Sequence, residues 1–132
     1  MEFVDMLNML IEQVRNDLDF TSFLTGLRNN NIIYYIHFIS TGNVRFITTT
    51  DAIISIKSKR KIILINSGNN IKKIKNIARL HFSGKLNYEQ YCTALADAGV
   101  FKWSVDLAEE RRDYWSKDNI LLHTEKVMLN IK

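Results

Sequence analysis

The chain has no proline, one cysteine and five glycines among its 132 residues. A single cysteine excludes an internal disulfide and a cysteine-based zinc knuckle, and it fits a reducing compartment. Without proline or a Gly/Ser-rich stretch, the sequence offers no flexible boundary between two parts. The glycines are scattered, so neither a phosphate-binding loop nor a dinucleotide-binding glycine pattern is present. We therefore expect a single domain over residues 1–132.

The sequence also has no apolar run that approaches the length of a membrane span. Its first ten residues carry acids where a secretory signal would carry bases, so we expect a cytoplasmic protein with no membrane partner. The net charge of +4 permits an anionic partner without requiring one. A hydrophobic content of 46% is typical of a folded globule, and a chain of this length buries about two-thirds of its unfolded surface.

The stretch Asn87–Leu107 combines a capped helix, a helix stop and a strand. Asn87 and Gln90 have the spacing of a capping box. Gly99 ends the helix because it adopts positive φ angles without a Cβ clash. Apolar residues occupy one helical face before it, namely Tyr88, Tyr91, Cys92, Leu95 and Ala96. After it, a period of two predicts a half-buried strand, with Trp103, Val105 and Leu107 inside and Lys102, Ser104 and Asp106 outside.

An earlier stretch has the same pattern and aligns with this one when the sequence is shifted by 68 residues. Leu27 falls under Leu95, Tyr35 under Trp103, and Asn31 under Gly99. Asparagine is the other residue that tolerates the left-handed conformation. The pattern predicts an α+β fold built from two similar helix–helix–strand–strand(–strand) pseudo-repeats, about 2–66 and 70–131. Because the connections have hairpin length, we expect one largely antiparallel sheet with helices packed on it.

Hydrophobic periodicity gives the remaining elements. We expect helices over 2–16, from Asp19 to about Arg28, and over Ile71–Phe82. Strands are expected over Ile32–Ile39, Val44–Thr49 and Ile120–Leu129 and around Tyr114-Trp115, with a hairpin turn at Thr41-Gly42-Asn43. Two β-branched runs, Ala52–Ile56 and Ile62–Ile65, flank the basic stretch Lys57–Lys61. They predict either a hairpin with a basic tip or one long bent strand.

Short motifs extend over nearly the whole chain: Asp19-Phe20, His81–Lys85, Tyr88–Cys92, Ala98–Asp106, Tyr114-Trp115 and Glu125. In these the sequence resembles the YbcV-like family of uncharacterised small bacterial proteins, some of which carry the label "phage envelope protein". The resemblance covers about Phe3–Val127 and implies a compact α+β domain of prophage-associated origin, with no established activity. Members of that family often have a second cysteine just before the aromatic pair. Here Arg111-Arg112 takes that place, so cysteine-pair chemistry is not expected.

The residues that could perform catalysis have simpler structural explanations. Cys92 lies on an apolar helical face, which indicates a small core residue rather than a nucleophile. His81 lies near a helix end, where the dipole and the last carbonyls favour an imidazolium, and His37 is expected to be a satisfied core or edge histidine. We assign no catalytic residue. His37, His81 and His123 share no ligand spacing, so we expect no metal and no cofactor.

Three carboxylates, Asp106, Asp113 and Glu125, could meet on adjacent strands as an acid–base pair. Exposed strand charges explain them more simply, since basic residues are expected opposite them on neighbouring strands. Those basic residues are Lys102, Arg112 and Lys126.

Three functions remain open. The first is a non-enzymatic interaction or small-ligand-binding domain, whose core or cleft would be lined by Tyr88, Tyr91, Trp103, Tyr114 and His81. The second is nucleic-acid binding through Lys57, Lys59, Arg60, Lys61, Lys72, Lys73 and Arg79, with Tyr34, Tyr114 and Trp115 as stacking faces. A solvated helix face and a gatekeeping loop explain the same charges. The third is a thiol- or histidine-dependent enzyme. The identity of any protein partner, including a second copy of the chain, stays open.

Overall fold

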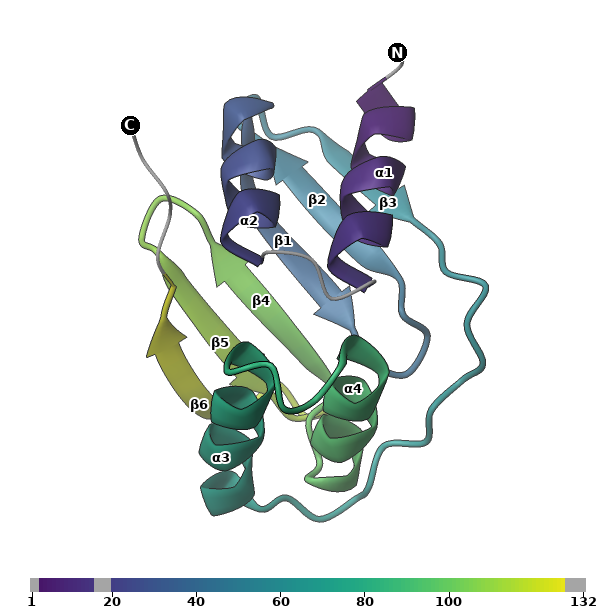
Figure 1. The fold of residues 1–132 in the computed structure, drawn as a ribbon, viewed down its shortest axis with the longest axis vertical. Helices are drawn as coiled ribbons and strands as arrows, with labels where there is room; N and C mark the ends of the chain where they lie inside the picture. Colours follow the sequence, from purple (N-terminus) through teal and green to yellow (C-terminus); the bar gives the residue numbers. More distant parts are fainter. Residues whose placement is uncertain (1–2, 16–19, 128–132) are drawn as a thin grey trace.

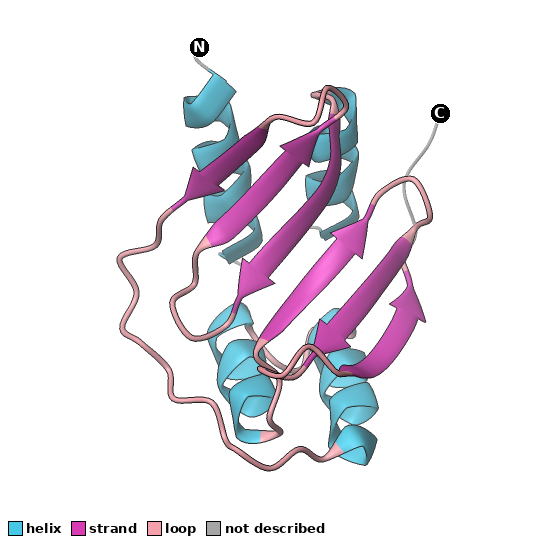
Figure 2. Cartoon of the chain, turned by 180° about the vertical axis from the view of Figure 1, so that it is seen from behind, coloured by secondary structure: helices cyan, strands magenta, loops and turns pink. Residues whose placement is uncertain are grey.

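The structure is a computed structural model that describes residues 3–15 and 20–127. Within these residues, four helices cover one face of a six-stranded sheet, and the opposite face carries no helix (Figures 1 and 2). The fold is α+β, as predicted. In chain order the elements are α1 (Phe3–Arg15), α2 (Phe20–Asn29), β1 (Ile32–Phe38), β2 (Val44–Thr48), β3 (Ile53–Ile56), α3 (Ile71–Phe82), α4 (Tyr88–Asp97), β4 (Lys102–Asp106), β5 (Arg111–Trp115) and β6 (Leu121–Lys126).

The strands follow the order β3-β2-β1-β4-β5-β6, and each neighbouring pair is antiparallel. The chain is thus arranged as two helix–helix–strand repeats that meet at the central β1–β4 pair. Ile36 lies opposite Ser104 in that pair, and the two residues are 68 positions apart in the sequence. An approximate twofold axis therefore passes through this pair and relates the halves.

Positive φ angles occur at matching places in the two halves. Asn31 (φ 66°) matches Gly99 (φ 88°), and Gly42 (φ 80°) matches Glu110 (φ 52°). A third match joins Asp51 to Asn119, again 68 residues apart. The left-handed turns that end helices and reverse strands thus recur at the predicted offset, although the residue types differ.

The helix predicted from the capping box is confirmed. The Asn87 side chain accepts from the Gln90 amide at 2.8 Å, and the Gln90 side chain accepts from the Asn87 amide at 2.9 Å. The predicted apolar face of α4 is buried throughout. In the first half, Asp19, the predicted cap of α2, lies outside the described residues. Among the described residues, no helix is long and apolar enough to cross a membrane.

The strand predicted after Gly99 has a less exposed outer face than expected. Trp103, Val105 and Leu107 are buried, but so is Ser104 on the open face of the sheet. The Trp115 indole covers it, and its Nε1 donates to the Ser104 hydroxyl at 2.9 Å. The open face is therefore only partly wet.

The prediction for Ile62–Ile65 is wrong, because this run forms neither arm of a hairpin nor an extension of β3. Instead, the chain is held against the β1–β2 turn. Arg60 Nη2 donates to the Ile39 carbonyl at 2.5 Å, and the Ile63 amide donates to the Ser40 carbonyl at 2.9 Å. The alternation still has a physical meaning, since Ile63 and Ile65 pack on the core while Ile62 and Leu64 are exposed. Residues 57–70 then run around the molecule to α3 (Figure 2).

Candidate functional site

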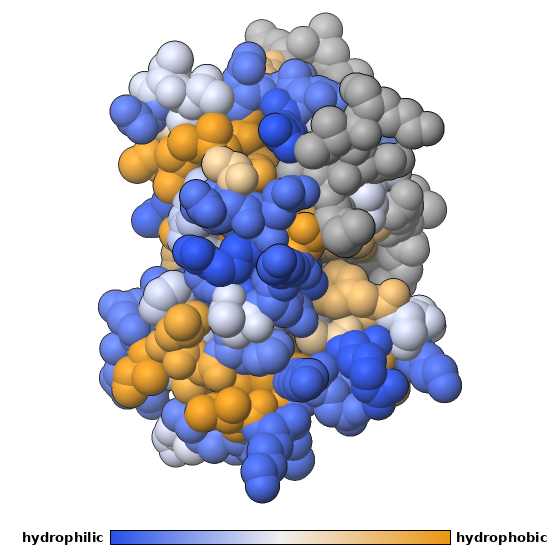
Figure 3. Space-filling model, turned by 90° about the vertical axis from the view of Figure 1, so that its left-hand side faces the viewer, coloured by the Kyte–Doolittle hydropathy of each residue, from blue (hydrophilic) through white to orange (hydrophobic). Residues whose placement is uncertain are grey.

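A cleft of about 920 Å³ lies where α2, α3 and β6 meet. Figure 3 faces this side of the molecule and shows strongly hydrophilic side chains beside hydrophobic ones. The basic side chains of the lining are Lys72, Lys75, Arg79, Arg112 and Lys126. Its apolar side chains are Val14, Phe20, Leu24, Ala78, Phe82, Leu86 and Val127. Of the described residues that line it, Glu125 is the only acid.

Arg112 is a buried cation in the wall of this cleft. It lies on β5 with 4% of its surface exposed. Its Nε donates to the Tyr114 hydroxyl at 3.1 Å and to Glu125 Oε1 at 2.9 Å. The rings of Phe82 and Phe20 lie 4.0 Å and 5.0 Å from its guanidinium carbon, which gives cation–π contacts. Its Nη1 is buried and has no hydrogen-bond partner among the described residues. The described residues therefore satisfy the guanidinium only in part.

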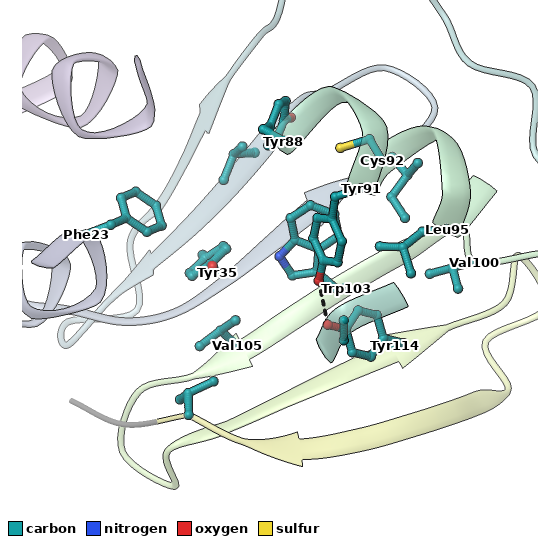
Figure 4. Packing of buried hydrophobic residues seen from close by; sticks show 14 of the residues in the cluster. Phe23, Tyr35, Tyr88, Tyr91, Cys92, Leu95, Val100, Trp103, Val105 and Tyr114 are labelled. Atoms are coloured by element: carbon teal, nitrogen blue, oxygen red, sulfur yellow. Dashed lines mark hydrogen bonds between the residues drawn. The ribbon is translucent and has the colours of Figure 1, made fainter. Parts of the chain in front are cut away.

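A chain of hydrogen bonds leads from the core to this ion pair. Tyr114 donates to Glu125 Oε1 at 2.7 Å, so the Tyr91 hydroxyl, 2.5 Å away, donates to Tyr114 (Figure 4). Burial raises the pKa of both tyrosines, so both phenols are neutral near pH 7. For Arg112, burial alone would lower the pKa, but the surrounding oxygens of Tyr114, Tyr91 and Glu125 raise it. The guanidinium is therefore permanently charged.

An irregularity in the strand register brings Glu125 to Arg112. In the first half, Val44 on β2 lies opposite Ile56 on β3. A shift of 68 residues would pair Arg112 with Thr124, but a bulge between Tyr114 and Trp115 moves the register by one, and Arg112 pairs with Glu125. Because side chains alternate between faces, this single step places Glu125 on the helix-covered face.

The expectation of exposed strand charges is wrong for Asp113, although Glu125 does lie opposite Arg112 as expected. Arg112 and Asp113 are both buried, on opposite faces of the sheet. Asp113 lies on the open face, where it accepts from Thr124 at 2.5 Å and from Arg111 at 3.1 Å. Of the three carboxylates predicted as a possible acid–base pair, Asp113 and Glu125 are separated by the strand alternation. Asp106 accepts from the backbone amides of Ala108 and Glu109. One sequence signal could have revealed that Arg112 is buried. The 68-residue shift aligns it with Val44, which is a buried apolar residue of the first half.

The aromatic residues predicted to line a core or cleft form the core behind the cleft. Tyr88, Tyr91 and Trp103 are buried and surround a void of about 20 Å³, while Tyr114 is buried beside Arg112. His81 alone of the predicted set lines the cleft itself. Its ring stacks on Tyr91 at 4.0 Å, and its Nδ1 donates to the Leu86 carbonyl at 2.8 Å. His81 therefore joins the cleft to the aromatic core.

The basic residues predicted as a nucleic-acid surface do not form one contiguous patch. Residues 57–61 follow β3 at the right-hand edge of Figure 1, whereas α3 lies at the lower left. Lys72 and Arg79 line the cleft, but Lys73, on the same helix, does not. Lys57, Lys59 and Lys61 are exposed, while Arg60 is half-buried against the β1–β2 turn. Arg60 thus has a structural role.

The remaining candidates are core residues. Cys92 is fully buried on α4, as predicted. His37 is buried on β1, as expected for a core histidine. Its ring stacks on Trp103 at 4.0 Å, and its Nε2 lies 2.5 Å from the Tyr88 hydroxyl. In the part of the chain that the structure describes, no three His, Cys, Asp or Glu side chains are grouped so that they could hold a metal ion.

Fold and cleft together define a small α+β protein with a helix-covered sheet and a cationic cleft. The chain belongs to the family described as "Protein of unknown function (DUF1398)", whose model matches residues 8–126. It is similar to the uncharacterized protein YcgX of Escherichia coli (strain K12), with 36% identity over 130 residues that cover 98% of this chain and 97% of YcgX. The uncharacterized protein YbcV of the same organism is 31% identical over 118 residues, 89% of this chain and 87% of YbcV. The resemblance inferred from the motifs is confirmed.

Proposed function

We propose that this protein binds a small organic anion in the cleft between α2, α3 and β6, with Arg112 as its anchor. The observation that carries the proposal is Arg112, a buried cation that lines a cationic cleft and whose Nη1 lacks a hydrogen-bond partner among the described residues. A buried donor without a partner costs free energy. An anionic oxygen of a ligand would supply the missing acceptor in a charge-assisted bond.

The first half of the chain supports this reading as an internal control. At the position equivalent to Arg112 it has Val44, which is buried and faces Ile56 across the strands. An apolar pair therefore fills this place in the same local fold. Since packing does not require an ion pair here, Arg112 and Glu125 are explained better by a function in the second half.

The cleft also suits an organic group. Ligand pockets commonly have volumes of about 300–1,000 Å³ and apolar walls with a few fixed polar groups. The volume of about 920 Å³ falls in that range, and Phe20 and Phe82 present aromatic surface next to Arg112. We further propose that the halves arose by duplication and that the second half acquired the binding role.

Nucleic-acid binding ranks second. It would need phosphates to contact both basic stretches, but residues 57–61 and α3 lie apart, and the Arg60 guanidinium contacts backbone carbonyls. A thiol- or histidine-dependent reaction ranks third, since Cys92 is buried and His81 has a structural bond to Leu86. A cytoplasmic location and a prophage origin stay expectations from the single cysteine and the family label.

The proposal is tested with ligands that share one ring and differ in charge. Calorimetric titration should show binding of an aromatic anion, benzoate or phenyl phosphate, and much weaker binding of benzyl alcohol and benzylamine. The key variant is Arg112→Val with Glu125→Ile, which copies the Val44–Ile56 pair of the first half. Replacing a buried ion pair by apolar residues is often neutral or stabilising, so this variant should fold. It should no longer bind the anion.

Lys73→Gln is the matched control, because Lys73 lies on α3 outside the cleft lining. It should bind the anion as the unmodified protein does. Failure of both anions to bind, or equal binding by the folded Arg112→Val/Glu125→Ile variant, would refute the proposal. Preferential binding of benzylamine would do so as well.

A further inference from the structure

One helix supplies most of the cationic lining of the cleft. Lys72, Lys75 and Arg79 follow one another at positions i, i+3 and i+7 of α3, so they share a helical face. All three line the cleft. The sequence of α3, IKKIKNIARLHF, contains no acid that could compensate them within the helix. Like charges at this spacing destabilise a helix slightly, so the arrangement has a cost.

The cationic face of α3 has no ion-pair partner among the described residues. In the part of the chain that the structure describes, no salt bridge involves Lys72, Lys75 or Arg79. Arg79 donates only to the neutral Asn76 side chain, at 2.5 Å. The one acid in the described lining, Glu125, already accepts from Arg112 and Tyr114 through Oε1. The lining formed by the described residues therefore carries five cations and one carboxylate, which is already engaged.

This excess charge discriminates between anions. A carboxylate ligand carries one negative charge and would be satisfied by Arg112 alone. A phosphate monoester carries about −1.5 to −2 charges near pH 7 and has three strong acceptor oxygens. It could therefore accept from the buried guanidinium and from the α3 side chains at once. The apolar lining would contact the organic part of the same molecule.

We propose that the natural ligand is a small organic phosphate monoester whose phosphoryl group is held by Arg112 together with the cationic face of α3. This inference rests on the proposed anion-binding function and adds the chemical class of the anion. The inference assigns phosphate binding to the three basic residues of α3 that line the cleft, and not to Lys73, which lies outside the lining.

The test compares phenyl phosphate with benzoate, since both present one ring and differ in the acid. At about pH 7.5 and about 0.15 M salt, phenyl phosphate should bind the full chain at least about tenfold more tightly. Its affinity should fall below about pH 6, where the monoester dianion takes up a proton and becomes a monoanion, while that of benzoate should change little. In Lys75→Gln/Arg79→Gln the preference should disappear, and in Lys73→Gln it should persist.

The outcomes separate the two proposals. If both probes bind equally and both need Arg112, the phosphate inference is wrong and the anion site stands. If neither binds, both proposals fall. A third arm uses oligothymidylate without terminal phosphates, which carries only phosphodiesters. Tighter binding of this strand than of phenyl phosphate, weakened by replacing Lys57, Lys59 and Lys61 with glutamine, would overturn the inference in favour of nucleic acid.

Discussion

Trp103 lies at the centre of the aromatic core on β4. Its ring stacks on His37 at 4.0 Å and lies 5.1 Å from the ring of Tyr91, and only 3% of its surface is exposed (Figure 4). Replacement of a large buried aromatic by alanine removes its packing and leaves a cavity. We expect Trp103→Ala to lower the free energy of unfolding by about 3–5 kcal/mol, a large share of the stability of a typical domain.

Urea unfolding followed by far-UV circular dichroism measures this loss. Trp115→Ala is the matched control, because Trp115 lies on the open face of the sheet and is partly exposed. It should cost clearly less. A Trp103→Ala variant as stable as Trp115→Ala would show that the core does not depend on the indole.

Buried tyrosines make stability depend on alkaline pH. Burial raises the pKa of Tyr35 from 10.0 to about 12, and it also raises the pKa values of Tyr91 and Tyr114. Above pH 10.0 the unfolded chain loses phenolic protons that the folded chain keeps, so the folded state binds more protons. The contribution is therefore fully present below the unfolded pKa and is lost as pH rises through the folded pKa.

We expect the free energy of unfolding to be flat up to about pH 9 and to fall steeply towards about pH 12. The share of Tyr35 is about 3 kcal/mol at most, because each pKa unit corresponds to about 1.4 kcal/mol. Urea unfolding at several pH values measures the fall. Tyr35→Phe should reduce it, and an equally large fall in that variant would contradict the prediction.

Sequence patterns predicted the apolar residues of the core better than the residues of the cleft. Burial of Cys92, Leu95 and Trp103 follows from alternation and helical spacing alone. Arg112 is a charged residue at a position where the alternation expects an apolar one. Because charged residues are mostly exposed, the sequence alone suggests that Arg112 is exposed. Glu125 lies beside Arg112 only because of the bulge between Tyr114 and Trp115, which no local sequence pattern predicts. Ion pairs inside a fold depend on such register details.

At the level of elements, Gly99 links α4 to β4 where the connecting segment passes close by. Its φ is +88°, and a Cβ atom there would lie 2.2 Å from the Gly68 carbonyl oxygen. Gly84 has the same backbone conformation, φ +85°, but a Cβ atom would have no neighbour within 4 Å. A substitution at Gly84 therefore measures backbone strain alone, whereas one at Gly99 adds a steric clash with the connecting segment.

We expect Gly84→Ala to cost about 1–2 kcal/mol, the strain of a left-handed non-glycine residue. Gly99→Ala should cost at least roughly twice as much, since backbone at Gly68 and Asn69 must also move. Thermal or urea unfolding of both variants gives the comparison. Equal costs would mean that the segment before α3 yields without loss of stability.

Element types were predicted well where one local signal dominated, as at the capping box of α4 and the left-handed stop at Asn31. Ile62–Ile65 was predicted wrongly because an alternating apolar run fits any extended segment with one buried side. Whether such a run joins a sheet depends on long-range hydrogen bonds. Here Arg60 and Ile63 bond to the carbonyls of Ile39 and Ser40, which holds the segment against the β1–β2 turn.

On the scale of the whole molecule, the two repeats share one core. β1 and β4 pair over five residues across the approximate twofold axis. His37 of the first half lies against Tyr88 and Trp103 of the second, and the buried apolar residues of both halves form one cluster. Neither half can therefore bury its apolar surface alone, and the predicted single domain should behave as one cooperative unit.

Tryptophan fluorescence and circular dichroism test this prediction, because the two signals report on different parts of the chain. Both tryptophans, Trp103 and Trp115, lie in the second half, whereas far-UV circular dichroism reports the helices of both halves. The two urea transitions should coincide. Leu27→Ala and its repeat equivalent Leu95→Ala, each removing a fully buried side chain, should cost about 2–5 kcal/mol. Each should shift both signals to the same midpoint. A Leu27→Ala variant whose dichroism changes before its fluorescence would show that the first half unfolds separately, and the chain would then consist of two domains.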